Sequence, residues 1–298
     1  MDMLRITDLY KSFGDKSVLS GLNLSVPAGS IFGFVGKNGA GKTTTMKIIL
    51  GLLTASSGEI TVNGERVVYG QTSTNRYIGY LPDVPEFYPF MTAREYLLFC
   101  GEITGLDSAS RASRADEMLS LVGLLGERHR IGGFSRGMKQ RLGIAQALLG
   151  RPKLLICDEP TSALDPIGRR EILDILLSIR ERTTVLFSTH VLSDVERICT
   201  DVAFLREGRV DMQGTISDIK AKYRSNEYVI ETAHAGDLSA LVGAFPDMRL
   251  DGGRAIFSED KSPLSEVLTY LAERRVPILK LERREPTLED LFREVADK

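Results

Sequence analysis

Apolar and polar residues alternate near the start of the chain, and continuous apolar runs follow further along. Leu4–Leu9 and Leu22–Val26 alternate as strands with one solvated face do, which predicts antiparallel strands near the N-terminus. Ile31–Val35 predicts a further strand, and Leu154–Cys157 and Thr184–Ser188 predict buried strands. Because these strands alternate with helical segments, the predicted fold class is α/β with a parallel core sheet and ligand chemistry at the carboxyl ends of its strands.

A helical block, at about residues 84–150, separates the early strands from the next buried strand. Thr92 and Glu95 have the spacing of a capping box, and apolar residues continue from there to Ile103. A second helix is predicted over about 110–122, and a third begins near Ser135. The sequence therefore predicts an inserted helical subdomain.

Beyond a polar stretch at residues 220–226, a new pattern starts. Its β-α-β-β-α-β order indicates a small α+β module of the ferredoxin-like kind. The predicted strands are 228–232, 248–251, 254–258 and 278–282, and the predicted helices are 237–244, 263–275 and 287–296. We therefore divide the chain into a first domain, residues 1–219, and an accessory C-terminal domain, residues 220–298, in which no cluster of chemically active residues stands out.

Length, charge and cysteine usage narrow the class of protein. The 298 residues suggest about two domains, and the net charge of −2 gives no electrostatic reason to expect nucleic acid as a partner. No apolar run approaches the roughly 18 residues that span a bilayer, and the first residues lack a signal-peptide pattern. The three cysteines lie far apart without metal-ligand spacing, as buried thiols in a reducing compartment would. We expect a cytoplasmic chain.

A glycine-rich segment between the strand Ile31–Val35 and a helix has the pattern of a phosphate-binding loop. Gly36, Gly39 and Gly41 can adopt backbone angles closed to other residues, so that successive N–H groups can face one anion. Lys42 offers an ammonium group to the β- and γ-phosphates, and Thr43 offers a hydroxyl group to Mg²⁺. The simpler alternative is an ordinary glycine turn before a helix.

Three other positions are candidates for the same chemistry. Asp158 and Glu159 end a buried strand, where one carboxylate can hold Mg²⁺ and the next can polarise water; the alternative is a pair of residues that cap the following helix. His190 follows another buried strand, as a contact to a γ-phosphate or as an ordinary core histidine. Ser135 before a glycine-containing helix start is either a second anion site or a simple N-cap.

In this order, the motifs resemble those of the nucleotide-binding subunit of an ATP-binding-cassette (ABC) transporter, over about residues 1–215. The family pattern runs from an aromatic residue through the Walker A loop, Q-loop, signature, Walker B strand and D-loop to a histidine. The matching positions are Phe13, Gly36–Thr44, Asp83, Phe134–Met138, Leu154–Glu159, Ser162–Asp165 and His190. The resemblance implies a P-loop ABC cassette with a parallel core sheet, an antiparallel β subdomain and an inserted helical subdomain.

Two positions depart from that pattern. Asp83 stands where the family has the Q-loop glutamine, and Arg136 replaces the first glycine of the signature. A carboxylate at residue 83 can still reach Mg²⁺ or its water, although its charge differs. Ser135 and Gly137 retain the serine and the amide that face a phosphate.

The resemblance also implies roles for individual residues, with ATP and Mg²⁺ as cofactors. Glu159 would activate water, His190 would contact the γ-phosphate, and Thr43, Asp158 and Asp83 would serve the metal. Ser135, Arg136 and Gly137 would act on the ATP of a partner chain, with Asp165 in the D-loop. The nucleotide would be held by Phe13, which would stack on adenine (plain packing is the alternative), and by Val18, Gly36, Asn38, Gly39, Ala40, Gly41, Lys42, Thr43 and Thr44.

The implied partners are a second copy of the chain, or a similar cassette subunit, and an integral membrane permease, through which the chain would lie on the inner face of the cell membrane. Three aromatic residues at positions 87, 88 and 90 form a plausible contact surface for the permease, with core packing as the alternative. The C-terminal module looks like the extension of exporter subunits, so export is the expected direction. A soluble ABC ATPase that acts on nucleic acid or ribosomes is the alternative, but such proteins usually have two cassettes or long coiled-coil insertions.

Overall fold

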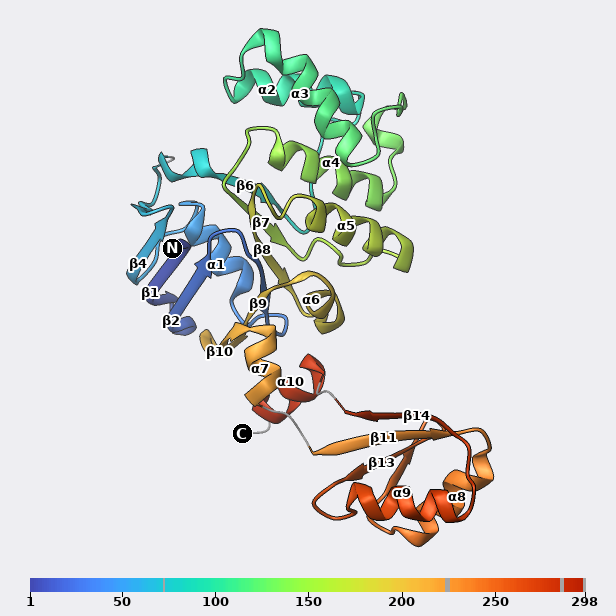
Figure 1. Cartoon of the computed structure of the whole chain (residues 1–298). Coiled ribbons are helices and arrows are strands. Elements are labelled where there is room, and N and C mark those ends of the chain that lie inside the picture. Colours follow the sequence, from blue (N-terminus) through green and yellow to red (C-terminus); the bar gives the residue numbers. More distant parts are fainter. Residues whose placement is uncertain (72, 223–225, 285–286, 297–298) are drawn as a thin grey trace. The chain divides into compact units, whose positions relative to one another are not determined.

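The computed structural model describes residues 1–71, 73–222, 226–284 and 287–296 (Figure 1). The chain divides into two compact units, Met1–Ile216 and Ser217–Lys298. Residues 223–225 of the predicted polar stretch lie outside the described residues.

The core of the first unit is a six-stranded sheet in the order β10-β9-β3-β8-β7-β6. All neighbouring pairs in this sheet are parallel except β9 with β10. Its strands are β3 (Ile31–Val35), β6 (Ile78–Leu81), β7 (Leu154–Asp158), β8 (Thr184–Thr189), β9 (Asp201–Arg206) and β10 (Arg209–Thr215). Every residue of β3, β7 and β8 is buried, as expected for apolar strands covered on both faces. The prediction of a parallel core sheet is confirmed.

A second, antiparallel sheet packs with the first through helix α1 (Lys42–Ile49). Its order is β2-β1-β4-β5, with β1 (Asp2–Phe13), β2 (Lys16–Pro27), β4 (Ser57–Val62) and β5 (Glu65–Arg66). One apolar cluster joins Leu4 and Ile60 of this sheet, Met46 of α1 and Ile156 of the parallel sheet. The first two strands are longer than predicted and pair as a hairpin up to Phe13 and Lys16. Phe13 therefore ends a strand and is not a loop residue.

The helical subdomain contains α2 (Ala93–Ile103), α3 (Ser108–Leu121) and α4 (Arg136–Leu148). A short 3₁₀ turn at Ile131–Gly133 lies between α3 and α4. The predicted capping box is present, because the Thr92 side chain accepts from the Glu95 amide and the Glu95 carboxylate accepts from the Thr92 amide. The second helix begins two residues before the predicted position, after Asp107, because residues 108 and 109 continue the helical turn.

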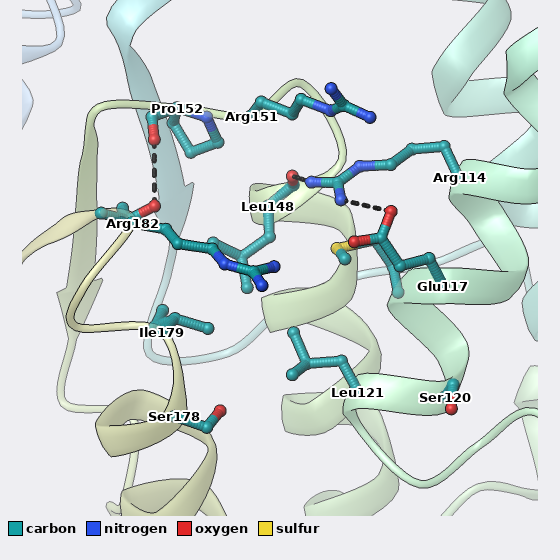
Figure 2. Close-up of a pocket in the computed structure, with 12 residues that line it drawn as sticks. Arg114, Glu117, Ser120, Leu121, Leu148, Arg151, Pro152, Ser178, Ile179 and Arg182 are labelled. Carbon is teal, nitrogen blue, oxygen red and sulfur yellow. Dashed lines mark hydrogen bonds and ion pairs between the residues drawn. The ribbon is translucent and has the colours of Figure 1, made fainter.

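Two glycines allow α4 to lie close against β6. A Cβ atom on Gly79 would lie 2.2 Å from the Ala147 carbonyl oxygen, and one on Gly143 would lie 2.5 Å from Leu81 Cδ1. Near the C-terminal end of α4, Arg114 of α3 donates to the Leu148 carbonyl oxygen (Figure 2) and also to that of Leu149. These contacts fix the signature helix to the edge of the core sheet.

Helices also follow the last core strands of the first unit. Helix α5 (Pro166–Ser178) follows β7 and α6 (Leu192–Ile198) follows β8, while a 3₁₀ turn at Ser73–Tyr77 precedes β6. Glycine at position 208 makes the turn between β9 and β10 with a φ of 76°. Strand β10, which completes the sheet after this turn, was not among the predicted elements.

The second unit has the predicted β-α-β-β-α-β order. Its elements are β11 (Glu227–Thr232), α8 (Ala235–Ala244), β12 (Arg249–Asp251), β13 (Arg254–Ser258), α9 (Leu264–Glu273) and β14 (Ile278–Arg283), with α7 (Ile216–Lys222) at the boundary and α10 (Leu288–Ala296) near the end. The antiparallel sheet order β12-β13-β11-β14 is that of a ferredoxin-like fold. Apolar residues of α8 and α9, including Leu241 and Val267, pack on Ile230 and Phe257 of the sheet.

Candidate functional site

The glycine loop connects the end of β3 to the first turn of α1. Gly39 and Gly41 have φ angles of 85° and 110°, in the left-handed region that favours glycine. A Cβ atom on Gly36 would lie 2.8 Å from the Leu205 carbonyl oxygen, so the start of the loop has room only for glycine. Helix α1 has no side-chain cap and no acidic residue in its first turn. Its N-terminal amides and positive dipole are therefore available to an anion.

Lys42 is buried and contacts three acceptors. Its Nζ donates to the Gly36 carbonyl oxygen at 2.6 Å and to that of Lys37 at 3.4 Å, and it lies 3.1 Å from Glu159 Oε1. That carboxylate oxygen is buried and makes no hydrogen bond, so the contact is an ion pair without hydrogen-bond geometry. The ammonium group is thus held between the loop and the end of β7.

Asp158 is buried at the end of β7, and both of its carboxylate oxygens accept hydroxyl groups. Thr43 donates to Oδ2 and Ser188 donates to Oδ1, each at 2.7 Å. The carboxylate is thereby oriented toward the first turn of α1, beside the Thr43 hydroxyl group. Carboxylate and hydroxyl oxygens are ligands that suit Mg²⁺.

Glu159, which follows Asp158 in the sequence, has a strained backbone conformation. Its φ of 48° lies in the left-handed region, which is uncommon for a residue other than glycine. The Glu159 amide donates to Ser188 Oγ at 3.0 Å and to the Ser188 carbonyl oxygen at 3.1 Å, which hold this conformation. The second carboxylate oxygen lies 2.9 Å from Nδ1 of His190, a half-exposed ring. Glu159 is therefore positioned by β8 on one side and Lys42 on the other.

A cavity of about 350 Å³ unites most of the predicted residues. It is lined by Val18, Asn38, Gly39, Gly41, Lys42, Thr43, Thr44, Asp83, Asp158 and Glu159. Burial raises the pKa of Asp83; the nearby Arg136 guanidinium opposes this increase, and the charges of Asp158 and Glu159 add to it. The Oδ1 atom of Asp83 is buried and makes no hydrogen bond. The cavity thus combines amide donors, one ammonium group and three carboxylates.

The signature residues do not line this cavity. Ser135 caps α4, with its side chain accepting from the Met138 amide at 3.2 Å. Arg136, in the first turn of α4, places Nη2 3.5 Å from Asp83 Oδ1, and both side chains are about half exposed. Ion pairs of such exposure contribute at most about 1 kcal/mol to stability. The signature therefore contacts the cavity only through the Arg136 side chain.

Other predicted residues also lie outside the cavity lining. Phe13 is half exposed, and the Lys11 ammonium group lies 4.8 Å from the centre of its ring. Asp165 is the N-cap of α5 and accepts from the Gly168 amide at 2.9 Å. Gly36 and Ala40 shape the loop, and the Gly36 amide donates to the Thr189 carbonyl oxygen. His190 contacts the cavity through Glu159.

The residue-by-residue prediction missed two residues that organise the site. Ser188 bonds both Asp158 and the Glu159 amide, and Gln140, which is fully buried, donates to the Asp83 carbonyl oxygen at 2.7 Å. A serine at the end of an otherwise apolar strand was the available signal for Ser188. Gln140 showed none, because its partner is a backbone atom distant in the sequence.

The cavity fits a nucleoside triphosphate with a divalent cation. Loop amides and Lys42 can receive phosphate oxygens, and Asp158 with Thr43 presents oxygen ligands. Glu159 and Asp83, each with a carboxylate oxygen that makes no hydrogen bond, both belong to the lining of this cavity. A parallel sheet with a glycine loop and two carboxylates at its carboxyl edge defines a P-loop nucleotide-binding protein.

Comparison with known proteins gives the family. Residues 19–162 match the "ABC transporter" family model, and residues 214–296 match the C-terminal domain of DrrA1-3-like ATP-binding proteins. The chain is 37% identical to the uncharacterized ABC transporter ATP-binding protein YxlF of Bacillus subtilis (strain 168), with 98% of this chain and 99% of that protein covered. It is 36% identical to the bacitracin transport ATP-binding protein BcrA of Bacillus licheniformis, over 97% and 96% of the two chains.

A third relative and a solved structure agree. The linearmycin resistance ATP-binding protein LnrL of Bacillus subtilis (strain 168) is 32% identical over 97% of each chain. The solved ATP-binding subunit of an ABC transporter is 33% identical, with a TM-score of 0.67, over 74% of this chain and 93% of that one. The chain belongs to the ABC transporter ATP-binding proteins, and it is an ATPase subunit of a transporter.

None of the helices in the described part of the chain combines the length and the apolar character that a membrane span requires.

The three cysteines are free thiols, and burial raises the pKa of Cys100, Cys157 and Cys199. Their thiolate forms, which would be the reactive ones, are therefore disfavoured.

Proposed function

We propose that the chain binds ATP·Mg²⁺ in this cavity and hydrolyses it as half of a dimer that drives a membrane exporter. The observation that best supports this is the arrangement of Lys42, Asp158 and Glu159 around one space. Lys42 and the loop amides hold the phosphates. The Thr43 hydroxyl group and Asp158 would hold Mg²⁺, which would lower the charge on the phosphates.

Glu159 is the proposed general base. Glu159 lines the cavity and its Oε1 makes no hydrogen bond, so the carboxylate can accept a proton from a water molecule that attacks the γ-phosphate. His190 holds the other oxygen at 2.9 Å and keeps the carboxylate oriented. The half-exposed ring of His190, which contacts the cavity residue Glu159, is the proposed contact of the γ-phosphate.

The composite site needs a second chain. Ser135 and Gly137 lie outside the lining of the chain's own cavity, at the exposed start of α4. An exposed helix N-terminus binds anions through its free amides and dipole. We therefore assign these residues to the ATP of a partner cassette, with Asp165 near the same interface. Phe13 and Val18 are the proposed contacts of the base.

A groove of about 650 Å³ between β6 and the helical subdomain is the proposed contact for the permease. Aromatic side chains of Tyr88 and Phe99 line it, packed edge to face at 5.8 Å. Phe90 is exposed nearby, whereas Phe87 packs on the buried Tyr96. The permease segment it would accept is apolar and aromatic, which follows from the exposed rings. Binding to the permease would place the chain at the inner face of the membrane.

Export is the proposed direction, because two relatives that match over nearly the whole chain are named for bacitracin transport and linearmycin resistance. Bacitracin and linearmycin are therefore the compounds to test first. The soluble alternative, an ATPase that acts on nucleic acid or ribosomes, is not favoured by any of these relatives.

Sedimentation of the Glu159→Gln variant tests the composite site. With ATP and Mg²⁺ it should form a stable dimer, because ATP binds but is not consumed, and EDTA should reverse this. Adding Ser135→Ala should weaken the dimer, whereas Ser120→Ala, an exposed serine of α3, should not. A Glu159→Gln chain that stays monomeric at saturating ATP would contradict the proposal. Stimulation of the ATPase by a co-expressed permease in vesicles, and its absence without that permease, tests the membrane partner.

A further inference from the structure

The two positions at which the chain departs from the family pattern contact each other within one subunit. Arg136 Nη2 lies 3.5 Å from Asp83 Oδ1. A carboxylate replaces the usual amide at one position, and a guanidinium replaces the usual glycine at the other. The two substitutions are therefore complementary in charge.

The backbone around this pair is held firmly. Gln140, on the same helix as Arg136, donates to the Asp83 carbonyl oxygen at 2.7 Å. The glycines at positions 79 and 143 leave no room between β6 and α4. Residue 83 and the start of α4 therefore keep their separation, and only the two side chains are free to change partners.

The ion pair itself is incomplete. Asp83 Oδ1 is buried but makes no hydrogen bond, so the guanidinium contact at 3.5 Å does not satisfy it. The Arg136 side chain is half exposed and adjoins Ser135. A planar guanidinium binds phosphate oxygens in pairs, and such charge-assisted bonds are stronger than a long, partly hydrated ion pair.

We propose that Arg136 exchanges partners during the ATP cycle. In the isolated subunit it neutralises Asp83, and in the closed dimer it turns to the phosphates of the second subunit's ATP. This inference rests on the proposed dimer, and it makes Arg136 a phosphate-binding residue of the partner's site that Asp83 holds while the dimer is open.

Four proteins, all with Glu159→Gln, test the exchange: the parent, Asp83→Asn, Arg136→Gln and the double variant. Sedimentation gives the dissociation constant of each ATP-dependent dimer. Arg136→Gln should weaken the dimer by roughly tenfold, the loss expected for one charge-assisted hydrogen bond. Asp83→Asn should tighten it by about threefold while Arg136 is present, because the arginine is released from its competing partner. In the Arg136→Gln background, Asp83→Asn should have no effect.

Equal effects of Asp83→Asn in both backgrounds would overturn the proposal, because Asp83 would then act on nucleotide directly. An unchanged dimer in Arg136→Gln would also overturn it. If the parent itself fails to dimerise, the proposed function fails as well, whereas the other two outcomes refute only the exchange. Binding of a fluorescent ATP analogue to dilute monomer should be the same in the parent and in Arg136→Gln.

The matched control is Asp116→Asn, which breaks the ion pair of Asp116 with Arg94 (2.7 Å, with similarly half-exposed side chains) elsewhere in the helical subdomain. It should leave the dimer unchanged. Thermal unfolding without nucleotide supplies an independent measurement: the melting-temperature changes of Asp83→Asn and Arg136→Gln should not add in the double variant. Strict additivity would show that the two side chains do not interact in the isolated subunit.

Discussion

The nucleotide cavity and the cavity between α3, α4 and α5 differ in how far their polar groups are already bound. The second cavity is the larger, at about 650 Å³ against about 350 Å³, and Arg114, Arg151 and Arg182 line it. In it, Arg114 already donates to two carbonyl oxygens at the end of α4 and pairs with Glu117 at 2.8 Å (Figure 2). The hydrogen bond from Arg114 lowers the pKa of Glu117, with further lowering by the charges of Arg114, Arg151 and Arg182.

In the smaller cavity, several polar groups have no hydrogen-bond partner. Carboxylate oxygens of Asp83 and Glu159 there are buried without hydrogen bonds, and the first amides of α1 have no capping side chain. Burying polar groups without partners is costly, so a ligand that satisfies them gains affinity. Volume alone would thus select the arginine-lined cavity, whereas the unsatisfied polar groups select the smaller one, in which we propose that the nucleotide binds.

Removal of the proposed base should have the largest effect. Glu159→Gln should lower ATP turnover by roughly 10²- to 10⁴-fold, or about 3–5 kcal/mol in the activation barrier, while ATP still binds. Phosphate release under single-turnover conditions measures this. The control Glu181→Gln changes an exposed carboxylate in the turn before β8 and should be silent. Hydrolysis by Glu159→Gln at a near wild-type rate would exclude Glu159 as the base.

Loss of the buried ammonium group comes next. Lys42→Ala should weaken ATP binding by roughly 10- to 100-fold, because a charge-assisted contact to phosphate disappears and Glu159 loses its counter-ion. Equilibrium filter binding of labelled ATP provides the measurement. Lys37→Ala, an exposed lysine of the same loop, is the matched control. Equal affinities of wild type and Lys42→Ala would place the phosphates elsewhere.

Removing the Ser188 hydroxyl group, by which β8 holds Asp158 and Glu159, should have a smaller effect on ATP turnover. Ser188→Ala removes the hydroxyl group that bonds Asp158 Oδ1 and the Glu159 amide, and it leaves a buried carboxylate oxygen with one partner fewer. Unfolding should become easier by about 1–3 kcal/mol, and turnover should fall by roughly tenfold with little change in KM. Urea denaturation and steady-state kinetics separate the two. A large rise in KM with unchanged turnover would show that Ser188 acts on binding and does not position the base.

The arginine-lined cavity should respond least in activity. Arg114→Met should cost about 1–3 kcal/mol of stability through the unpaired carbonyl oxygens of Leu148 and Leu149, yet leave ATP turnover within about twofold. Arg182→Met, in the exposed turn before β8, should change neither. Strong inhibition by Arg182→Met would mean that this cavity also has a role in the ATP cycle, and the contrast between the two cavities would fail.

Most of the fold was predictable because its signals are local. Buried strands appear as unbroken apolar runs, the capping box at Thr92 has a fixed spacing, and the elements of the ferredoxin-like unit fall within a few residues of their predicted positions. Strand β10 was missed because it lies at the sheet edge and has no buried residue, only exposed and half-buried positions that alternate weakly. The length of β1 was missed because pairing with β2 extends it beyond its apolar core.

The site was predictable where one motif contains all of its parts, and less so where distant segments meet. The glycine loop is contiguous in sequence, and its glycines have the expected left-handed angles at positions 39 and 41. By contrast, the contacts of Ser188 with Asp158 and of Arg136 with Asp83 join separate elements. The spacing of Asp83 and Arg136 in the sequence does not show that their opposite charges meet, because the packing of α4 on β6 brings the two residues together.

That packing has a mechanical consequence. Gly79 and Tyr80 of β6, with Gln146 and Ala147 of α4, form part of the wall of the proposed permease groove, and the strand and helix touch there through backbone atoms. Side-chain layers yield under load by changing rotamers, whereas a direct backbone contact has little such compliance. We therefore expect a push at the groove to pass along α4 toward Ser135 at its other end. The absence of a side chain at Gly79 is what allows this direct backbone contact.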